Sequence, residues 1–409
     1  MVADRGATHP RRVVLGLGGT VDYEVVWDAA VLERLVREYR ILPTELDHAG
    51  AIASERDLVV SILSFLRAGA GGERFVASSA IIERFASRLD TRVTLGGTCV
   101  RAAIAMSAVG VPSTVHLVSM NDATRRLLPG DVDWICSAEE DSTDPHLIVQ
   151  YPRGARVRSG DVDVVAPHPN RLIYANDPPH RELVLSDQLG ATLADAGIFL
   201  VSSLNVIQER AVLDARLAAL QRSMRHLPGD ALVVFEDAGY HVAAFSRVVR
   251  DALAPIVDVY GCNEDELQAH LDRTVDLLDP DDVAVAVEEF AAIVQVPALV
   301  VHTRHWALAH GPEAGRYALA LAGGTTMAAT RYRCGDGFGA RDYHRTAALP
   351  VQTAGAALAR GLRNLLGAAV VCVPAHDIAT DDPTTIGLGD TFVGGFVAAL
   401  TAPSSTNPE

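Results

Sequence analysis

The chain alternates short apolar runs with longer segments rich in Ala, Leu and Arg, and this pattern limits the available folds more than any other feature. Apolar runs of a few residues are typical of buried strands, whereas the segments between them are long enough for helices. Such alternation favours a mostly parallel sheet covered by helices, the arrangement of α/β proteins. The runs lie at 198–202, 231–235, 256–259, 298–302 and 368–373.

Between about residues 22 and 187 the pattern is different. Short β-rich pieces, such as 113–118 and 161–165, lie among Pro, Gly and Asp residues. Short strands separated by turn residues favour a small sheet rather than a helix-covered parallel one. We therefore expect this region to form a small β-rich lid beside the larger α/β domain.

A glycine turn, a carboxylate and an expected helix start follow one another within residues 384–396. Gly387 and Gly389 allow consecutive N–H groups to point into one concavity, and the apolar run 392–400 predicts a helix whose positive end lies behind it. A carboxylate repels a resting anion, but it can take a proton from an attacking hydroxyl. Asp390 is therefore a candidate base for phosphoryl transfer, and the structural alternative is an ordinary glycine turn that Asp390 caps.

Acidic and amide side chains follow two of the strand-like runs. Glu236 comes directly after the run 231–235, and Asn263 and Glu266 begin a helix-like segment after 256–260. Oxygen atoms of this kind suit Mg²⁺, either directly or through water. We expect a magnesium site here, although surface carboxylates exposed to solvent are the usual fate of Glu.

Two more glycine segments lie where α/β proteins bind ligands. The apolar run 13–15 leads into Gly16, Gly18 and Gly19 and is followed by Asp22, and Gly96-Gly97-Thr98 opens an Ala-rich helical stretch. Loops next to strand ends and helix starts form ligand sites in such folds. The first segment also resembles part of a dinucleotide-binding fingerprint, but Val21 stands at the place of its third glycine.

Together these segments resemble the ADP-dependent glucokinase and phosphofructokinase family, a branch of the ribokinase-like sugar kinases. Asn263-x-x-Glu266 is similar to the family's N-x-x-E metal motif, 385–390 is similar to its G-x-G-D anion hole and base, and 234–236 is similar to its strand end that carries another acidic residue. Weaker matches, which keep the family's order, lie at 96–97, 146–151, 170–173 and 300–303.

The resemblance implies a three-layer α/β sandwich with a mostly parallel central sheet and a small β-rich lid. The lid of this family is built from separate segments inserted into the larger domain. On this basis we expect residues 1–21, 76–112 and 188–409 to form the large nucleotide-binding domain, and residues 22–75 and 113–187 to form the lid.

The same resemblance implies a role for each matching residue. Asp390 accepts the proton of the acceptor hydroxyl, and the backbone N–H groups of Gly387, Leu388 and Gly389 hold the transferred phosphate. The resemblance further implies Mg²⁺ at Glu236, Asn263 and Glu266, the donor nucleotide at Arg171, His302 and Thr303, and the acceptor at Asp22, Gly97, Thr98 and Asn205.

The departures from the family concern the acceptor. Thr20 stands where the family has Asn, Thr98 stands where it has Gln, and Gln150 replaces an acidic residue. Because the shorter Thr cannot reach a sugar hydroxyl that Asn or Gln would bind, the sequence supports the donor chemistry better than any particular acceptor.

The composition agrees with a soluble enzyme that has small-molecule partners. A net charge of −16 opposes binding to nucleic acid or to a membrane surface, since both are polyanions. The five cysteines include no C-x-x-C pair, and no apolar run approaches the ~20 residues of a membrane span. We expect a cytoplasmic protein, either a monomer or a homodimer.

Three functions remain compatible with these residues. The first is a Mg²⁺-dependent kinase that uses ADP to phosphorylate a hydroxyl of a sugar or sugar-like alcohol. The second is an ATP-dependent ribokinase-like kinase for a nucleoside or cyclitol, since 389–396 also resembles the corresponding segment of those enzymes. The third is a non-catalytic ligand-binding relative, against which the intact Asp390, Asn263 and Glu266 argue.

Overall fold

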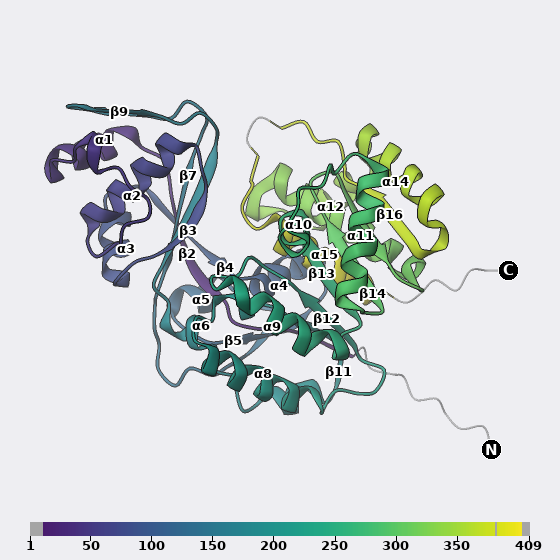
Figure 1. The fold of residues 1–409 in the computed structure, drawn as a ribbon. Helices are drawn as coiled ribbons and strands as arrows, with labels where there is room; N and C mark the ends of the chain where they lie inside the picture. Colours follow the sequence, from purple (N-terminus) through teal and green to yellow (C-terminus); the bar gives the residue numbers. More distant parts are fainter. Residues whose placement is uncertain (1–10, 381–382, 403–409) are drawn as a thin grey trace, which may run out of the picture.

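Two β-sheets of unequal size form the framework of the chain, of which the computed structural model describes residues 11–380 and 383–402 (Figure 1). The larger sheet has 9 strands, and among the described residues only β15 runs antiparallel to its neighbours. From edge to edge its strands are β16 (Val370–Pro374), β15 (Trp306–His310), β14 (Ala298–His302), β13 (Val259–Asn263), β12 (Leu232–Glu236), β11 (Ala196–Val201), β1 (Arg12–Leu15), β5 (Ser113–Leu117) and β6 (Val132–Cys136).

Helices cover both faces of this sheet (Figure 1). One face carries α8 (Arg210–Met224), α9 (Ala243–Leu253), α10 (Glu264–Leu271), α11 (Pro280–Val294) and α14 (Thr353–Leu366). The other carries α4 (Thr98–Ala108), α12 (Ala318–Cys334) and α15 (Leu388–Leu400). Alternation along β14 explains the two layers, because Leu299 and Val301 pack toward the first group of helices, whereas Ala298 and Val300 pack toward the second. The expected three-layer sandwich is confirmed.

The smaller sheet has 5 strands, and in the part of the chain that the structure describes helices cover one of its faces. Its strands in order are β3 (Gly72–Phe75), β10 (Asn170–Ala175), β7 (His146–Tyr151), β2 (Thr20–Val25) and β4 (Thr91–Gly96), and its helices are α1 (Ala29–Tyr39), α2 (Glu55–Ala68) and α3 (Ser79–Ala86). Leu147 and Val149 of β7 pack into this helical core, and so do Leu172 and Tyr174 of β10. The opposite face of the sheet is therefore free to line a ligand site.

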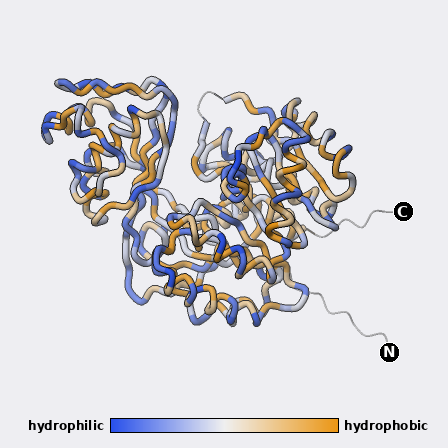
Figure 2. Tube along the Cα trace, in the orientation of Figure 1, coloured by the Kyte–Doolittle hydropathy of each residue, from blue (hydrophilic) through white to orange (hydrophobic). Residues whose placement is uncertain are grey.

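The remaining elements are short. β8 (Arg156–Ser159) and β9 (Val162–Val165) form a two-stranded ribbon at the outer end of the smaller sheet, and α5 (Asp122–Leu127), α6 (Pro178–Glu182), α7 (Leu189–Leu193) and α13 (Ala340–Ala347) occur in connections. Figure 2 shows hydrophobic segments gathered between the layers and hydrophilic ones on the outer surfaces. Within the described residues no helix is long and apolar enough to cross a membrane.

Sheet membership differs from the expected segments in three places. β5 and β6 fall in the segment 113–187 that we expected to form the lid, yet both extend the larger sheet next to β1. β4 falls in the expected large-domain segment 76–112 but pairs with β2 in the smaller sheet. β5 contains the polar residues Thr114 and His116, and both side chains are buried within the larger domain.

The strand-like run 256–259 also lies earlier than the strand that forms. Ala254–Ile256 is a 3-10 turn, and β13 begins only at Val259. Pro255 stands at the start of this turn, where its missing N–H is not needed and its fixed φ suits the turn, so the chain enters the sheet only after the turn.

Candidate active site

The C-terminal glycine turn forms as the sequence predicts, and it ends at the start of α15. Gly387 has φ 65°, the left-handed conformation that favours glycine, and its carbonyl oxygen accepts the N–H of Thr391 at 3.0 Å. A Cβ atom at position 387 would lie 2.7 Å from Cδ of Arg101. Glycine is therefore required here both for its conformation and for its close contact with the Arg101 side chain.

Two cavities meet at this turn. The interdomain cavity, of about 240 Å³, is lined by the free face of the smaller sheet, by the start of α4 and by Gly387 and Asp390. The C-terminal cavity, of about 580 Å³, is lined by the ends of β13 and β14, by α12 and by Leu388 and Gly389. A group bound against residues 387–390 would therefore be within reach of ligands in both cavities.

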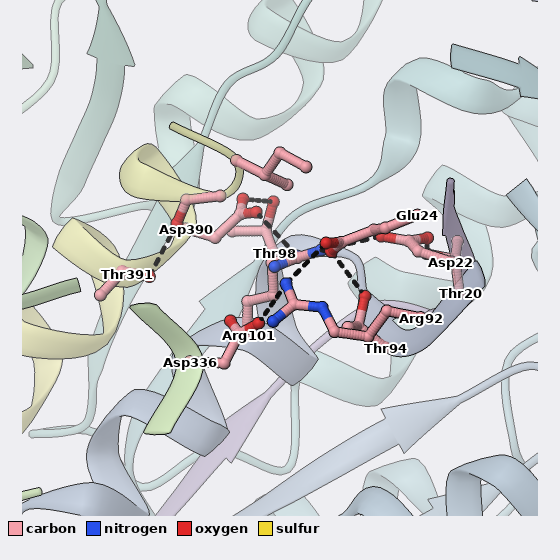
Figure 3. Close-up of polar contacts among 12 residues, drawn as sticks. Thr20, Asp22, Glu24, Arg92, Thr94, Thr98, Arg101, Asp336, Asp390 and Thr391 are labelled. Atoms are coloured by element: carbon pink, nitrogen blue, oxygen red, sulfur yellow. Dashed lines mark hydrogen bonds and ion pairs between the residues drawn. The ribbon is translucent and has the colours of Figure 1, made fainter. Parts of the chain in front are cut away.

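Asp390 is held at the edge of the interdomain cavity by two neighbours (Figure 3). The hydroxyl of Thr98 donates a hydrogen bond to Oδ1 of Asp390 at 2.9 Å, and Nε of Arg101 lies 3.9 Å from Oδ2. The Asp390 side chain keeps 27 % of its surface exposed, so a ligand hydroxyl can reach it. A carboxylate that is oriented by a donor yet open to the cavity is suited to accept a proton.

Arg101 also holds Asp22, the second acidic residue of this wall (Figure 3). The side chain of Arg101 is buried, and its Nη2 donates to Oδ2 of Asp22 at 2.8 Å while lying 3.7 Å from Glu24. Thr20 donates its hydroxyl to Oδ1 of Asp22 at 2.8 Å. Thr20 therefore orients Asp22.

The free face of the smaller sheet contributes alternate residues to the interdomain cavity. His146 and Ile148 of β7 line it, as do Arg171, Ile173 and Ala175 of β10. The acceptor residues expected from the sequence gather at the same cavity, namely Asp22, Gly97, Thr98 and Asn205. Arg171, expected at the donor phosphates, lies here and not in the C-terminal cavity.

His302 and Thr303 line the C-terminal cavity at the end of β14. The His302 ring stacks on Phe392 of α15 with 4.5 Å between centroids, and its Nε2 is 2.8 Å from Oε1 of Glu236. Burial alone lowers the pKa of His302, but the charge and hydrogen bond of Glu236 outweigh it and raise that pKa. Thr303 accepts the backbone N–H groups of His305 and Trp306, so it shapes the loop that borders the cavity.

Asn263 and Glu266 form a capping box at the start of α10, next to the same cavity. Oε2 of Glu266 accepts the backbone N–H of Asn263 at 2.6 Å, and Oε1 accepts from its side-chain amide at 2.8 Å. Burial raises the pKa of Glu266 well above its usual range, and the charges of Glu236 and Asp237 raise it further. Burial raises the pKa of Glu236 as well.

The acidic group, that is, Glu236, Asn263 and Glu266, fits the magnesium ion that the family resemblance implies. The donors are carboxylate and amide oxygens, which suit a hard cation, and the mutual repulsion of buried carboxylates would be relieved by a positive charge. Asn263 lines the C-terminal cavity directly, whereas Glu236 and Glu266 contact cavity residues from behind, through His302 and Asn263.

Several residues at the site did not stand out in the sequence. Arg101 is the lone charged residue in the apolar helix α4 and lies three positions after Thr98, so it shares one helical face with that residue. A buried charge on an apolar helix was the signal that could have identified it. His180 and His241 also line the interdomain cavity. Gln150, already noted in the sequence as a departure from the family, accepts a hydrogen bond from Thr385 at 3.2 Å and so links the smaller sheet to the glycine turn.

The chain is similar to known proteins in sequence and in fold. The sequence model of the ADP-specific phosphofructokinase/glucokinase conserved region matches residues 11–397. A phosphofructokinase from Pyrococcus horikoshii OT3, crystallised with AMP, is 16 % identical, with 96 % of this chain and 98 % of that chain covered and a TM-score of 0.79. A last common ancestor of ADP-dependent phosphofructokinases from Methanosarcinales is 15 % identical, with coverages of 96 % and 94 % and a TM-score of 0.76.

A third similar structure is an ADP-dependent kinase in complex with fructose-6-phosphate and ADPβS. It is 14 % identical, with 97 % of this chain and 95 % of that chain covered, and its TM-score is 0.70. At such low identity these three structures show a shared fold. No curated protein sequence matches the chain significantly.

Proposed function

Because the chain belongs to the ADP-specific phosphofructokinase/glucokinase family, we propose that it transfers the terminal phosphoryl group of ADP to a sugar hydroxyl, with Asp390 as the base. The family makes the protein a sugar kinase, that is, a phosphotransferase with an alcohol acceptor. The observation that carries the more detailed proposal is the meeting of the interdomain and C-terminal cavities at residues 387–390. The acceptor occupies the first cavity, and the nucleotide occupies the second.

In the proposed reaction the acceptor hydroxyl oxygen attacks the β-phosphorus of ADP. The new O–P bond forms as the bond to the bridging oxygen breaks, and AMP leaves with that oxygen and its electron pair. Asp390 takes the hydroxyl proton, and Thr98 orients the carboxylate through its 2.9 Å hydrogen bond. The N–H groups at the start of α15, in residues 387–389, hold the transferred phosphoryl oxygens, because a helix start is electropositive.

Glu236, Asn263 and Glu266 would hold Mg²⁺, which when bound neutralises charge on the donor phosphates. In the protein without the ion, these three residues place two buried carboxyl groups beside the C-terminal cavity. His302 stabilises the charged form of Glu236 and fixes the wall of the cavity against Phe392.

The lining of the interdomain cavity favours an acceptor that carries an anionic group, such as a sugar phosphate. Arg74, Arg101 and Arg171 all line it. Arg101 is neutralised by Asp22, and Arg74 donates its Nη2 to the carbonyl oxygens of Ala49 and Gly50. Within the described residues no ion pair joins Arg171 to a carboxylate, so the Arg171 guanidinium can bind a phosphate group of the acceptor.

A panel of free hexoses and hexose phosphates, each supplied with ADP and Mg²⁺, tests this proposal through the formation of AMP. We expect turnover with a hexose phosphate, and Arg171→Gln should raise the KM for that acceptor more than tenfold, the loss expected for about 1.5–3 kcal/mol of charged hydrogen bonding. Arg158→Gln is the matched control, because the Arg158 side chain is 71 % exposed on the outer ribbon. Equal turnover of free hexoses, with no effect of Arg171→Gln, would contradict the anionic acceptor.

A further inference from the structure

Two histidines and one aspartate gather at the wall of the interdomain cavity, apart from the acidic group beside the C-terminal cavity. His146 comes from β7 of the smaller sheet, and Asp177 and His180 belong to the connection after β10. Nε2 of His146 lies 3.2 Å from Oδ2 of Asp177, and Nδ1 of His180 lies 3.9 Å from the same oxygen. One potential ligand atom from each residue lies within 4.8 Å of the others.

The two ring nitrogens of His180 are buried without a hydrogen-bond partner in the described part of the chain. The residue is only 4 % exposed, yet neither nitrogen has a hydrogen-bond partner among the described residues. A buried polar atom without a partner is rare and calls for an explanation. Asp177 caps α6, but that contact joins its Oδ1 to the backbone N–H of His180 and leaves the imidazole unused. An ion pair of His146 with Asp177 would likewise not account for His180.

We propose that His146, Asp177 and His180 form a three-ligand site for a transition-metal ion of the Zn²⁺ type. Metal–ligand bonds of about 2.0–2.1 Å in tetrahedral geometry separate the ligand atoms by roughly 3.3–3.4 Å. The distances from Oδ2 of Asp177 to the two imidazole nitrogens, 3.2 and 3.9 Å, lie on either side of that value. Small rotations of the side chains therefore bring the three atoms to one ion. A cavity of about 30 Å³ adjoins them and provides space for such an ion.

The chemistry of the ligands separates this site from the magnesium site. Imidazole nitrogen prefers Zn²⁺ and its neighbours in the transition series, whereas Mg²⁺ prefers oxygen ligands. Asp177 supplies one negative charge, and Arg181, which lines the same small cavity, opposes a cation. Neutral imidazoles and one carboxylate leave the bound ion with a net positive charge, which the nearby carboxylates of Asp22 and Glu73 reduce.

The site would connect the two parts of the fold. His146 belongs to the smaller sheet, and residues 177–182 lead from that sheet back to the larger one, so the metal ion would fix their relative position. Three protein ligands leave the fourth tetrahedral position open. Because His146 and His180 also line the interdomain cavity, that position is accessible to an oxygen atom of a ligand bound there.

Titration of chelator-treated protein with Zn²⁺ by calorimetry, in excess Mg²⁺, tests the site without any reliance on kinase activity. We expect one Zn²⁺ per chain in the wild type, and a visible absorption spectrum of tetrahedral type when Co²⁺ replaces Zn²⁺. His180→Gln and Asp177→Asn should each weaken Zn²⁺ binding by at least about tenfold, since even indirect changes to metal ligands cost 10–100-fold.

Asp177→Asn is the informative variant, because the amide oxygen of Asn still caps α6 while the charge is lost. His344→Gln, an exposed histidine on α13, is the matched control and should leave the affinity unchanged. His305→Gln reports binding in the C-terminal cavity instead, since His305 lines that cavity. The absence of Zn²⁺ binding by the wild type, or equal binding by the wild type, Asp177→Asn and His180→Gln, would overturn the proposal.

Discussion

Replacing Arg101 by Met should destabilise the protein far more than the same change at a neighbouring exposed arginine. The Arg101 side chain is 4 % exposed and lies 2.8 Å from Asp22, 3.7 Å from Glu24 and 3.9 Å from Asp390. Met fills a similar volume but leaves three carboxylates without this cation, and two of them are buried. Breaking a buried pair by removal of one partner costs about 3–5 kcal/mol.

The matched control is Arg92→Met. Arg92 shares Glu24 with Arg101, at 2.6 Å, but its side chain is 54 % exposed. Because water screens the half-exposed Arg92 guanidinium and Arg101 still faces Glu24, loss of Arg92 should cost about 1 kcal/mol. With an unfolding entropy of about 2.1 cal/mol/K for each of the 409 residues, the two changes correspond to losses in Tm of about 4–6 °C for Arg101→Met and about 1 °C for Arg92→Met.

Thermal unfolding followed by circular dichroism measures both variants under one condition. Equal losses of Tm in the two variants would refute the reasoning, because burial would then not change how much an arginine contributes to the stability of the protein.

Enzyme kinetics provide a second test. Arg101 holds Asp22 in the interdomain cavity and does not line the C-terminal cavity, so Arg101→Met should raise the acceptor KM and leave the ADP KM unchanged.

Three further changes probe the base, the metal group and a buried histidine. Asp390→Asn should lower kcat by about 10²–10⁴-fold with ADP binding retained in calorimetry, and near-normal kcat would remove Asp390 from the mechanism. Glu266→Gln should raise the Mg²⁺ concentration for half-maximal activity, because the side chain loses its charge; an unchanged Mg²⁺ titration would count against the metal assignment. Burial lowers the pKa of His116 from 6.5 to about 4, so between these pH values the unfolded chain binds a proton that the folded chain does not, and stability falls as the pH is lowered. This loss amounts to at most about 3 kcal/mol, and His116→Gln, which can still accept the N–H of Ser186, should lose less stability than the wild type between pH 7 and pH 4 in urea unfolding.

The sequence predicts the strands of the larger sheet well, because their apolar runs and the helices between them are local patterns. It does not predict which sheet a short strand joins. β4 and β5 have similar mixtures of polar and apolar residues, and only long-range pairing separates β4, next to β2, from β5, next to β1. Thr114 and His116 of β5 are buried by neighbouring segments far away in the sequence, which no local pattern reports.

In the candidate site, too, the sequence predicts the residues that belong to local motifs and not those brought together by long-range contacts. Asp22, Gly97, Thr98 and Asp390 could be expected together because each belongs to a recognisable motif, and all four line one cavity. Arg101 belongs to no motif, and its contacts join segments 79 residues apart, so its position became evident only from the structure. The grouping of His146, Asp177 and His180 likewise depends on how a strand end and a connection are folded together.

The central claim is that a phosphoryl group passes from ADP in the C-terminal cavity to an acceptor in the interdomain cavity across residues 387–390. A ³¹P NMR time course with Mg²⁺, a hexose phosphate and either ADP or ATP tests it most directly. The account predicts equal amounts of AMP and a newly phosphorylated acceptor from ADP, with much slower transfer from ATP and none from ADP in Asp390→Asn. Efficient transfer from ATP with no AMP formed from ADP would contradict it.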